Sequence, residues 1–286
     1  MAERRGCLPN LLVIGAMNAG TTSLYHYLRF HPEIHMSTPK ELLFFGDGWN
    51  WERGLDWYAS HFDPSFAVNG EASPLYTTFP ENPEIPERIA RLVPRAKLIY
   101  LVRDPIERMI SQWVTWRSSD REDRSLEEAL LDEDRNLYVA RSRYWTQISR
   151  YLDHFGASRI LIVQSERLAD DRLATLKRVF SFLGVDPEFE TARFAIRRHG
   201  TGRKRRKTAA GRRLDRSRLV SVLRRVPARL RWPIEDLLFH PVSRPIARPT
   251  LGSGPRRELA ALLSDEVARL RAFSGLELAD WMGGRG

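Results

Sequence analysis

The residues best suited to chemistry lie in a glycine-bounded segment near the start of the chain, from Gly15 to Ser23. Gly15 and Gly20 bracket a tight loop in which the backbone can turn sharply and a ligand can come close. Thr21, Thr22 and Ser23 follow, and each is a residue type that caps a helix start. A glycine loop leading into a helix presents free N–H groups and the positive end of the helix dipole to one point. The segment therefore predicts an anion site.

The spacing of this loop resembles a Walker A loop, Gly-x4-Gly-Lys-Ser/Thr, with one difference. Thr21 stands where that loop has the lysine that serves the terminal phosphates of a nucleoside triphosphate. The absence of this lysine argues against an ATPase or a kinase and favours a different phosphate ester. Because short glycine patterns are weak evidence, a strand, a turn and a helix with incidental glycines explain the loop alone equally well.

A second strand that leads directly into a helix lies at Lys97–Arg103, whose sequence KLIYLVR is typical of a buried strand. Asp104 is a good N-cap residue, and Pro105 suits the first helical position. Glu107 follows Asp104 by three residues, as in a capping box. We therefore expect a helix from this point to about Trp116.

Strands and helices alternate along the chain, which predicts an α/β fold with a parallel sheet. The other expected strands are Leu11–Ile14, Glu33–Met36, residues 67–71 and Arg159–Val163. The other expected helices follow the glycine loop and span Pro86–Leu92, residues 126–155, Leu173–Leu183 and Arg256–Phe273. The last of these should bury Leu259, Leu262, Leu263, Val267 and Leu270. Residues 46–65 are expected to form an ordered surface loop. Because ligands bind beyond the carboxyl ends of parallel strands, the loops after the strands should share one edge.

Length and composition limit the possible functions. The 286 residues allow one large domain or two small ones, and the net charge of +10 predicts anionic partners. Cys7 is the only cysteine, which excludes an intrachain disulfide and a multi-cysteine metal site. No apolar segment is long enough for a signal peptide or a membrane span, so we expect a cytoplasmic protein. Residues 198–218 are crowded with arginine and lysine, which fits either a solvated basic loop or a flap over an anionic ligand.

Several motifs together resemble one family. These are VIGAMNAGTTSLYHYLRFHP, PKELLFF, GEASPLY, LIYLVRDPIERMISQW and ILIVQSERL, and their order is similar to that of the sulfotransferases, in the heparan-sulfate and bacterial carbohydrate branch. The resemblance implies a P-loop-like three-layer fold with a central parallel sheet flanked by helices. It also implies a transferase that uses 3′-phosphoadenosine-5′-phosphosulfate (PAPS) as sulfuryl donor. The likeness covers roughly residues 9–205 of a chain that we expect to be one domain over 1–286. In addition to this core, the domain should contain a basic loop at about 198–218 and a C-terminal helical part at about 219–286.

The resemblance also implies nucleotide-binding residues. For the 5′-phosphate these are Ala19, Gly20, Thr21, Thr22 and Ser23, and for the 3′-phosphate they are Arg103 and Ser111. An arginine fork suits phosphate oxygens, although Arg103 could instead pair with Asp104 or Glu107. The basic loop that closes over the nucleotide in the family corresponds to Gly202, Arg203 and Lys204, which favours the flap interpretation of the charge run. The extra basic residues that follow leave its register open.

By the same resemblance, Glu41 is the general base that takes a proton from the acceptor. Apolar residues from Leu42 to Phe45 follow it, and such surroundings would raise the pKa of this carboxyl toward a useful value. A surface glutamate at a turn is the alternative. Glu71 is a second candidate for the base, and the histidines at 31 and 35 are weaker ones.

One position departs from the family pattern. Asn18 stands where the family loop usually has a lysine that stabilises charge on the leaving phosphate. The asparagine can donate a hydrogen bond but brings no charge, and the loss of such a contact typically costs ~10²–10³ in rate. Lys40 or Lys204 could substitute, the enzyme could be slow, or the chain could bind the nucleotide without turnover. We favour a working or weakened enzyme.

The expected partner is a small molecule or a glycan that offers a hydroxyl or an amine. The aromatic residues Trp49, Trp51, Trp57 and Tyr58 could stack on a sugar ring, but packing within the core or a lid is the favoured interpretation. No metal is expected. A catalytically inactive nucleotide-binding module is the main alternative. A nucleic-acid-binding protein is supported only by the net charge, because no recognisable binding motif is present.

Overall fold

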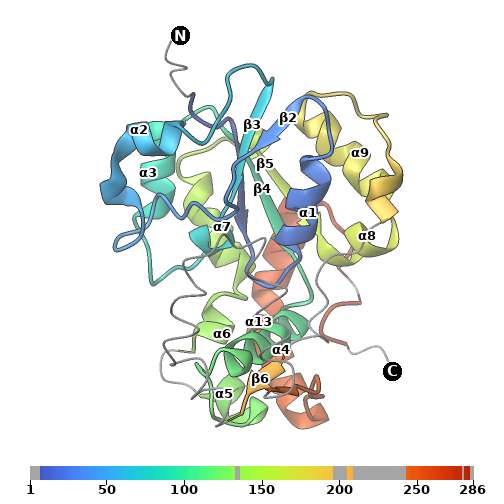
Figure 1. Cartoon of the computed structure of the whole chain (residues 1–286). Helices are drawn as coiled ribbons and strands as arrows, with labels where there is room; N and C mark the ends of the chain where they lie inside the picture. Colours follow the sequence, from blue (N-terminus) through green and yellow to red (C-terminus); the bar gives the residue numbers. More distant parts are fainter. Residues whose placement is uncertain (1–6, 133–135, 196–204, 209–242, 279, 284–286) are drawn as a thin grey trace.

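The computed structural model describes residues 7–132, 136–195, 205–208, 243–278 and 280–283. A five-stranded parallel sheet in the order β2-β3-β1-β4-β5 forms its centre (Figure 1). The strands are β1 (Leu11–Gly15), β2 (Ile34–Met36), β3 (Val68–Ala72), β4 (Lys97–Val102) and β5 (Ile160–Gln164). The parallel sheet and all five expected strands are thus confirmed, and each end differs from the expected one by at most one residue.

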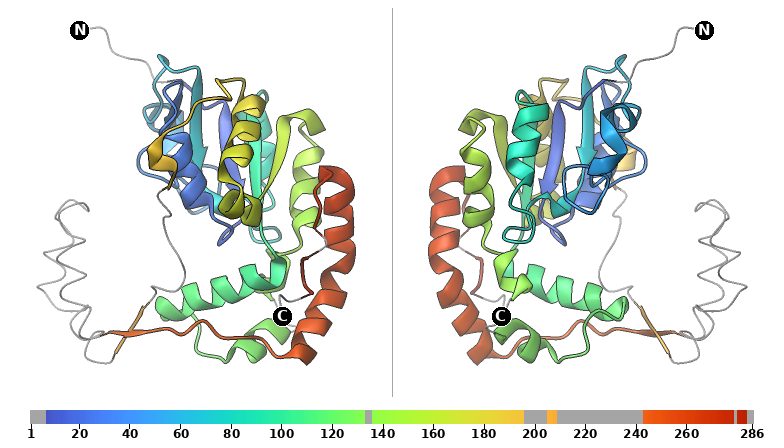
Figure 2. Two further views of the ribbon diagram at one scale, coloured as in Figure 1. Left: turned by 90° about the vertical axis from the view of Figure 1, so that its right-hand side faces the viewer. Right: turned by 90° about the vertical axis from the view of Figure 1, so that its left-hand side faces the viewer.

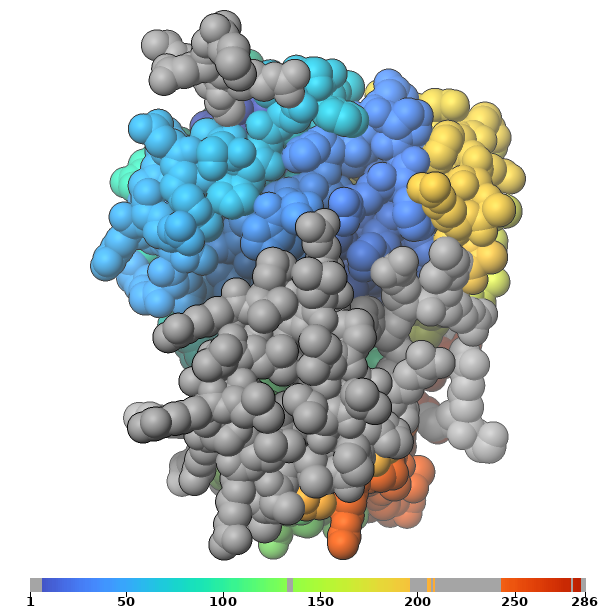
Figure 3. Space-filling model, viewed as in Figure 1, coloured from blue at the N-terminus to red at the C-terminus, as the bar shows by residue number. Residues whose placement is uncertain are grey.

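Helices cover both faces of this sheet, as predicted (Figure 1). On one side lie α1 (Thr21–Leu28), α8 (Ser165–Asp170) and α9 (Arg172–Leu183), and on the other lie α3 (Ile85–Leu92) and α7 (Tyr144–Leu152). Figure 3 repeats the view of Figure 1 in space-filling form and shows the blue N-terminal segments beside the yellow region of α9. Short 3-10 turns occur at Trp51–Arg53, Pro74–Tyr76, Ala157–Arg159 and Ala192–Ala195.

Two segments differ from the expected secondary structure. The expected surface loop at 46–65 contains a short helix, α2 (Gly54–Ala59), because Tyr58 is fully buried and anchors it to the core. The expected helical stretch at 126–155 is divided into α5 (Leu126–Leu131), α6 (Leu137–Ala140) and α7. Asn136 explains one division, because its side chain caps α6 by accepting from the N–H groups of Tyr138 and Val139.

A second group of elements lies beyond the carboxyl ends of the strands. It comprises α4 (Pro105–Ser118), α5, α6, α13 (Ser253–Ser274) and an antiparallel pair formed by β6 (Arg205–Lys207) and β7 (Ser243–Pro245). Figure 2 shows α13 extending from the other elements of this group to the outer side of α7, and α13 contacts α4, α5 and α7. The structure has two apolar cores, one around the sheet and one between α4 and α5. The N-terminal half of α13 packs in the core beside α4, and its C-terminal half packs in the core of the sheet.

The buried face of α13 is close to the predicted one. Leu259 and Leu263 pack in the core under α4, while Val267 and Leu270 pack in the core of the sheet. Leu262, which was also expected to be buried, is 49 % exposed. Adjacent residues project about 100° apart around a helix, and in α13 Leu263 faces the core while Leu262 lies at the solvent edge of the apolar stripe.

Among the described residues, no helix combines the length and the apolar character that crossing a membrane requires.

Leu270 and Leu262 of α13 form a matched pair for testing this packing. Leu270 is fully buried, so Leu270→Ala should lower the free energy of unfolding by about 2–5 kcal/mol. Leu262→Ala removes the same atoms from a surface position and should cost less than about 0.5 kcal/mol. Urea denaturation of both variants measures the difference. Equal losses would show that α13 is not docked as described.

Candidate functional site

The glycine loop joins β1 to α1 at the carboxyl edge of the sheet. At Gly15 a β-carbon would lie 2.0 Å from Thr77 Oγ1, so no larger residue fits there without displacement. Gly20 is the N-cap of α1 and has a φ of +96°, a conformation that glycine adopts without strain. The prediction that Thr21, Thr22 or Ser23 caps the helix is wrong, because α1 begins at Thr21 and no side chain caps it. The first N–H groups of α1 are therefore not used by a cap.

Asn18 presents a buried donor within this loop. Its φ is +67°, in the left-handed region that asparagine tolerates better than most residues. Its Oδ1 accepts a 3.0 Å hydrogen bond from Thr115 Oγ1 on α4. Its Nδ2 is buried and has no hydrogen-bond partner in the described part of the chain. The position where the resemblance implies a cation thus holds a neutral, oriented amide donor.

The second corner of the site follows β4. Asp104 caps α4 as predicted, because its Oδ1 accepts from the N–H groups of Ile106 at 2.9 Å and Glu107 at 3.0 Å. The predicted capping box is wrong. The N–H group of Asp104 donates instead to Glu166 Oε1 at 2.9 Å, since Glu107 is held by two arginines of the C-terminal part.

Arg103 and Ser111 meet at this corner. Arg103 Nη1 donates a 2.8 Å hydrogen bond to Ser111 Oγ, and Ser111 is fully buried. Burial, followed by the nearby charge of Arg248, lowers the pKa of the Arg103 guanidinium. The alternative ion pair with Asp104 or Glu107 is not formed. A guanidinium beside a buried hydroxyl is a donor set suited to phosphate.

The two corners lie against the same helix. Thr115, which contacts the glycine loop, follows Ser111 by one turn of α4, a rise of about 6 Å. The loop is also tied to β4 by a 2.6 Å hydrogen bond from Ala16 N to Leu101 O. Arg108, which is fully buried, places Nη1 3.5 Å from Met17 O. Two donor sets thus lie side by side at the carboxyl edge of β1 and β4.

Glu41 lies on an irregular strap, residues 40–45, which follows β2. Lys40 Nζ donates to Glu41 Oε1 at 2.5 Å, and the Glu41 side chain is 40 % exposed. The expected apolar surroundings are therefore wrong. Glu41 and Leu43 have positive φ angles, and the neighbouring Phe44 and Phe45 point into the core while the carboxylate faces outward. The structure brings Lys40 and Glu41 together as an ion pair in which the Glu41 side chain is exposed and the Lys40 side chain is only 14 % exposed.

Glu71 is not accessible to a substrate. Its side chain is fully buried, and it accepts hydrogen bonds from Tyr58, from Ser73 Oγ at 2.6 Å and from Tyr76 at 2.5 Å. Burial raises the pKa of this carboxyl although the three hydrogen bonds act to lower it. The prediction of Glu71 as a second candidate for the base is wrong for this reason.

Glu71 instead anchors the strap that carries Glu41. Ser73 Oγ accepts a 3.1 Å hydrogen bond from Leu43 N, and Tyr76 Oη accepts a 2.8 Å hydrogen bond from Phe44 N. Both hydroxyls donate to Glu71 at the same time. One buried carboxylate therefore fixes the backbone two and three residues beyond Glu41, a role that the sequence did not indicate.

The aromatic residues near the strap pack within the core. Tyr58 is buried and stacks on Phe44 with ring centroids 4.2 Å apart. Trp49, Trp51 and Trp57 are partly buried against the same core. The favoured interpretation, packing rather than an open stacking platform, agrees with these contacts.

The two histidines have structural contacts. His31 is 1 % exposed, and its Nε2 lies 3.0 Å from Asp186 O. His35 Nε2 lies 3.0 Å from His61 O.

The late basic loop is described only in part. Gly202, Arg203 and Lys204 lie outside the described residues, so their predicted role stays a prediction. Arg206 pairs with Asp120 and Asp123, which ties β6 to the end of α4. Another arginine, Arg248, reaches Ser111 from a segment that matched no motif, and sequence reasoning missed it.

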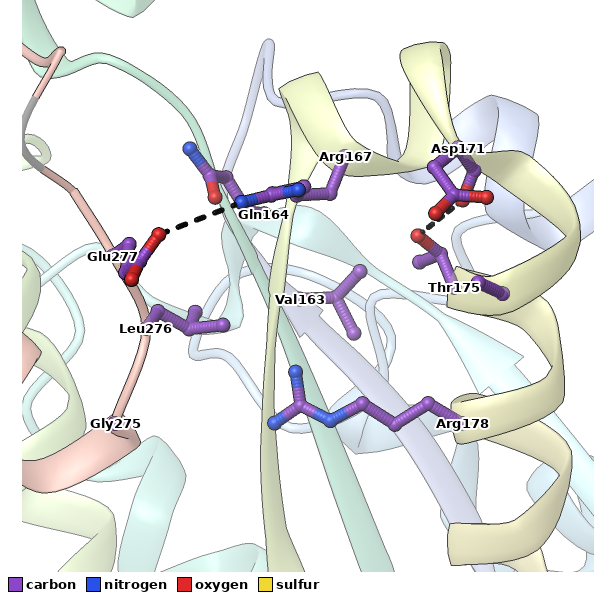
Figure 4. A pocket seen from close by; sticks show the side chains of 10 residues that line it. Val163, Gln164, Arg167, Asp171, Thr175, Arg178, Gly275, Leu276 and Glu277 are labelled. Carbon is purple, nitrogen blue, oxygen red and sulfur yellow. Dashed lines mark hydrogen bonds and ion pairs between the residues drawn. The ribbon is translucent and has the colours of Figure 1, made fainter.

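A separate pocket of about 390 Å³ opens beside the edge strand β5 (Figure 4). Its lining includes Gln164, Arg167, Arg178 and Glu277, and Arg167 lies 3.9 Å from Glu277. None of the predicted site residues that the structure describes lines this pocket. Among the described residues, no cluster of three or more histidine, cysteine or acidic side chains could hold a metal ion.

The pH dependence of stability tests the burial of Glu71. The unfolded carboxyl titrates near ~4.3, while burial raises the pKa in the folded protein, so the folded state binds more protons. The free energy of unfolding of the wild type should therefore fall, relative to Glu71→Gln, as the pH rises from about 4 through the raised pKa. Denaturant titrations at several pH values measure this difference. The exposed control Glu52→Gln should show no such trend, and a flat difference for Glu71→Gln would contradict the burial.

Comparisons with known proteins agree with this geometry. Residues 8–206 match the family model of the sulfotransferase domain. The bifunctional heparan sulfate N-deacetylase/N-sulfotransferase 1 of Caenorhabditis elegans is 30 % identical over 198 residues, which are 64 % of this chain and 22 % of that protein. The membrane-associated sulfotransferase kil1 of Dictyostelium discoideum is 41 % identical over 112 residues, 37 % of this chain and 23 % of that protein. The chain thus spans about a fifth of the length of these relatives.

One solved structure covers nearly the whole chain. The crystal structure of a sulfotransferase from Alicyclobacillus acidocaldarius superimposes with a TM-score of 0.69 and 24 % identity, over 96 % of this chain and 99 % of that one. It supports the fold. The family model carries the assignment, because it covers both β-to-α corners and the strap. The chain belongs to the sulfotransferase domain family.

Proposed function

We propose that this protein transfers a sulfuryl group from PAPS to an amine or a hydroxyl of a carbohydrate. The observation that carries the proposal is the juxtaposition of two anion-binding corners on α4. One corner is the glycine loop with the Asn18 amide, and the other is the Arg103–Ser111 pair. A nucleotide with phosphates at both ends suits two such corners, and the unpartnered Asn18 Nδ2 fits a ligand oxygen.

Each corner has a distinct task in this proposal. The N–H groups of Gly20, Thr21 and Thr22, at the start of α1, hold the 5′-phosphate. Arg103 and Ser111 hold the 3′-phosphate through charge-assisted hydrogen bonds. When bound, PAPS supplies an activated sulfuryl group whose bond to the 5′-phosphate breaks on transfer.

Glu41 acts as the general base. It accepts the proton that the acceptor amine or hydroxyl loses as its nitrogen or oxygen bonds to sulfur. The exposure of the carboxylate suits contact with an acceptor that arrives from solvent. The buried Glu71 supports this role by fixing the strap through Leu43 and Phe44. Lys40 keeps a cation beside the base.

The names of the relatives support one class of acceptor. Matched proteins are named as heparan sulfate N-deacetylase/N-sulfotransferases, which supports a glycan amine exposed by deacetylation as the acceptor. A cytoplasmic location stays a prediction from the sequence.

Asn18 makes this a weakened enzyme in our proposal. Negative charge grows on the leaving phosphate during transfer, and a cation stabilises it better than an amide does. The buried Nδ2 still offers one hydrogen bond. A nucleotide-binding protein without turnover is the second candidate, and the same neutral donor favours it.

A transfer assay tests the proposed function. With radiolabelled PAPS and a glucosamine-containing oligosaccharide, the wild type should label the form with free amines more than the N-acetylated form. Glu41→Gln should lower kcat by ~10²–10⁴-fold, the typical share of general base catalysis. Its affinity for adenosine 3′,5′-bisphosphate should remain within about twofold, because Glu41 lies outside both anion-binding corners. The exposed Glu52→Gln is the control. Nucleotide binding without any turnover would favour the second candidate, and no nucleotide binding would contradict both.

Asn18→Lys tests the weakening. It should raise kcat by roughly tenfold or more, because it restores a charge contact of the kind worth ~10²–10³ in rate. Part of the gain is offset by the left-handed backbone at this position, which suits lysine less well. Asn18→Leu, which removes the donor, should lower kcat. A rate within about twofold of the wild type for the lysine variant would sink this explanation.

A further inference from the structure

Two arginines converge on the Ser111 hydroxyl. Arg103 Nη1 lies 2.8 Å from Ser111 Oγ, and Arg248 Nη1 lies 3.1 Å from the same oxygen. Arg103 directly follows β4, whereas Arg248 comes from the segment between β7 and α13. The Arg248 side chain is 31 % exposed, so a ligand can reach it.

The donors at this point outnumber the acceptors. A hydroxyl oxygen offers two lone pairs and one hydrogen. Both lone pairs of Ser111 face guanidinium groups, which leaves its hydrogen for a further acceptor. The nearby charge of Arg248 adds to burial in lowering the pKa of Arg103, a sign of like-charge repulsion. An anion between the two guanidinium groups would relieve this repulsion.

Glu107 holds Arg248 in place. Its Oε2 accepts from Arg248 Nη2 at 2.5 Å, and its Oε1 accepts from Arg256 Nη2 at 2.9 Å. Burial alone would raise the pKa of Glu107, but the hydrogen bonds from Arg256 and Arg248 lower it below its usual value. The carboxylate therefore uses one nitrogen of Arg248 and leaves the other directed at Ser111.

The C-terminal part frames this corner at other points too. Met282 N donates a 2.6 Å hydrogen bond to Asp104 Oδ2, and Trp281 packs against Tyr144. Figure 2 shows the segment that leads from β7 to α13 running along α4. Arg248 lies beyond residues 8–206, which the family model covers.

We propose that Arg248 is a second arginine ligand of the nucleotide 3′-phosphate, supplied by the C-terminal part of the chain. Together with Arg103 and Ser111 it selects nucleotides that carry a 3′-phosphate over those that lack it. This inference rests on the proposed function. Glu107 acts as a positioning residue that aims the Arg248 guanidinium.

A comparison of two nucleotides isolates the contact. Calorimetry measures the binding of adenosine 3′,5′-bisphosphate and of adenosine 5′-monophosphate, which lacks only the 3′-phosphate. Arg248→Met should weaken the bisphosphate by roughly 10- to 100-fold, the effect of losing a hydrogen bond between charged groups. It should change the affinity for the monophosphate by less than about twofold, because that ligand never reaches Arg248. Arg244→Gln removes an exposed positive charge from the same segment and should change neither affinity.

The outcomes separate this inference from the proposed function. Loss of affinity for both nucleotides in Arg248→Met, or for neither, would overturn the role of Arg248 while the wild type still binds the bisphosphate. A wild type that binds neither nucleotide would overturn the proposed function as well. If Arg248→Met fails to fold, Arg248→Lys keeps the charge but loses the planar fork, and it should show a smaller loss confined to the bisphosphate.

Discussion

The contact between the glycine loop and α4 is the constraint on which the rest of the site depends. Asn18 bonds to Thr115, and one turn earlier on the same helix Ser111 bonds to Arg103. Because β1 and β4 are neighbours in the sheet, their two following loops reach α4 side by side. A shift of α4 along its axis would separate both pairs at once. The cap at Asp104 opposes such a shift, since it fixes where the helix begins.

A second constraint fixes the strap that carries Glu41. Glu71 is buried, and three hydroxyl groups donate hydrogen bonds to it. Burying a carboxyl group is costly, and here the hydrogen bonds offset part of that cost. Two of the hydroxyls also hold the backbone of the strap at Leu43 and Phe44. The position of Glu41 is thus set by a group that never meets the substrate.

The sequence predicted the parts of the fold that depend on local pattern. The strands β1, β4 and β5 are continuous apolar runs, and the Asp104-Pro105 start of α4 is a local signal. Prediction from the sequence failed where contacts between distant segments decide which partner a side chain has. Glu107 was expected to bond to its own helix start, but arginines from the C-terminal part hold it. Arg248 meets Ser111 across 137 residues, and no local motif encodes that contact. The apolar residues that follow Glu41 suggested an apolar environment for its carboxylate, but Phe44 and Phe45 point into the core while Glu41 is exposed.

A crystal structure with adenosine 3′,5′-bisphosphate bound tests the central claim most directly. The account predicts the 5′-phosphate at the N–H groups of Gly20, Thr21 and Thr22, with Asn18 Nδ2 within hydrogen-bond distance of the ligand. It predicts the 3′-phosphate on Arg103 and Ser111. A nucleotide found elsewhere, or one that touches only one of the two corners, would contradict it.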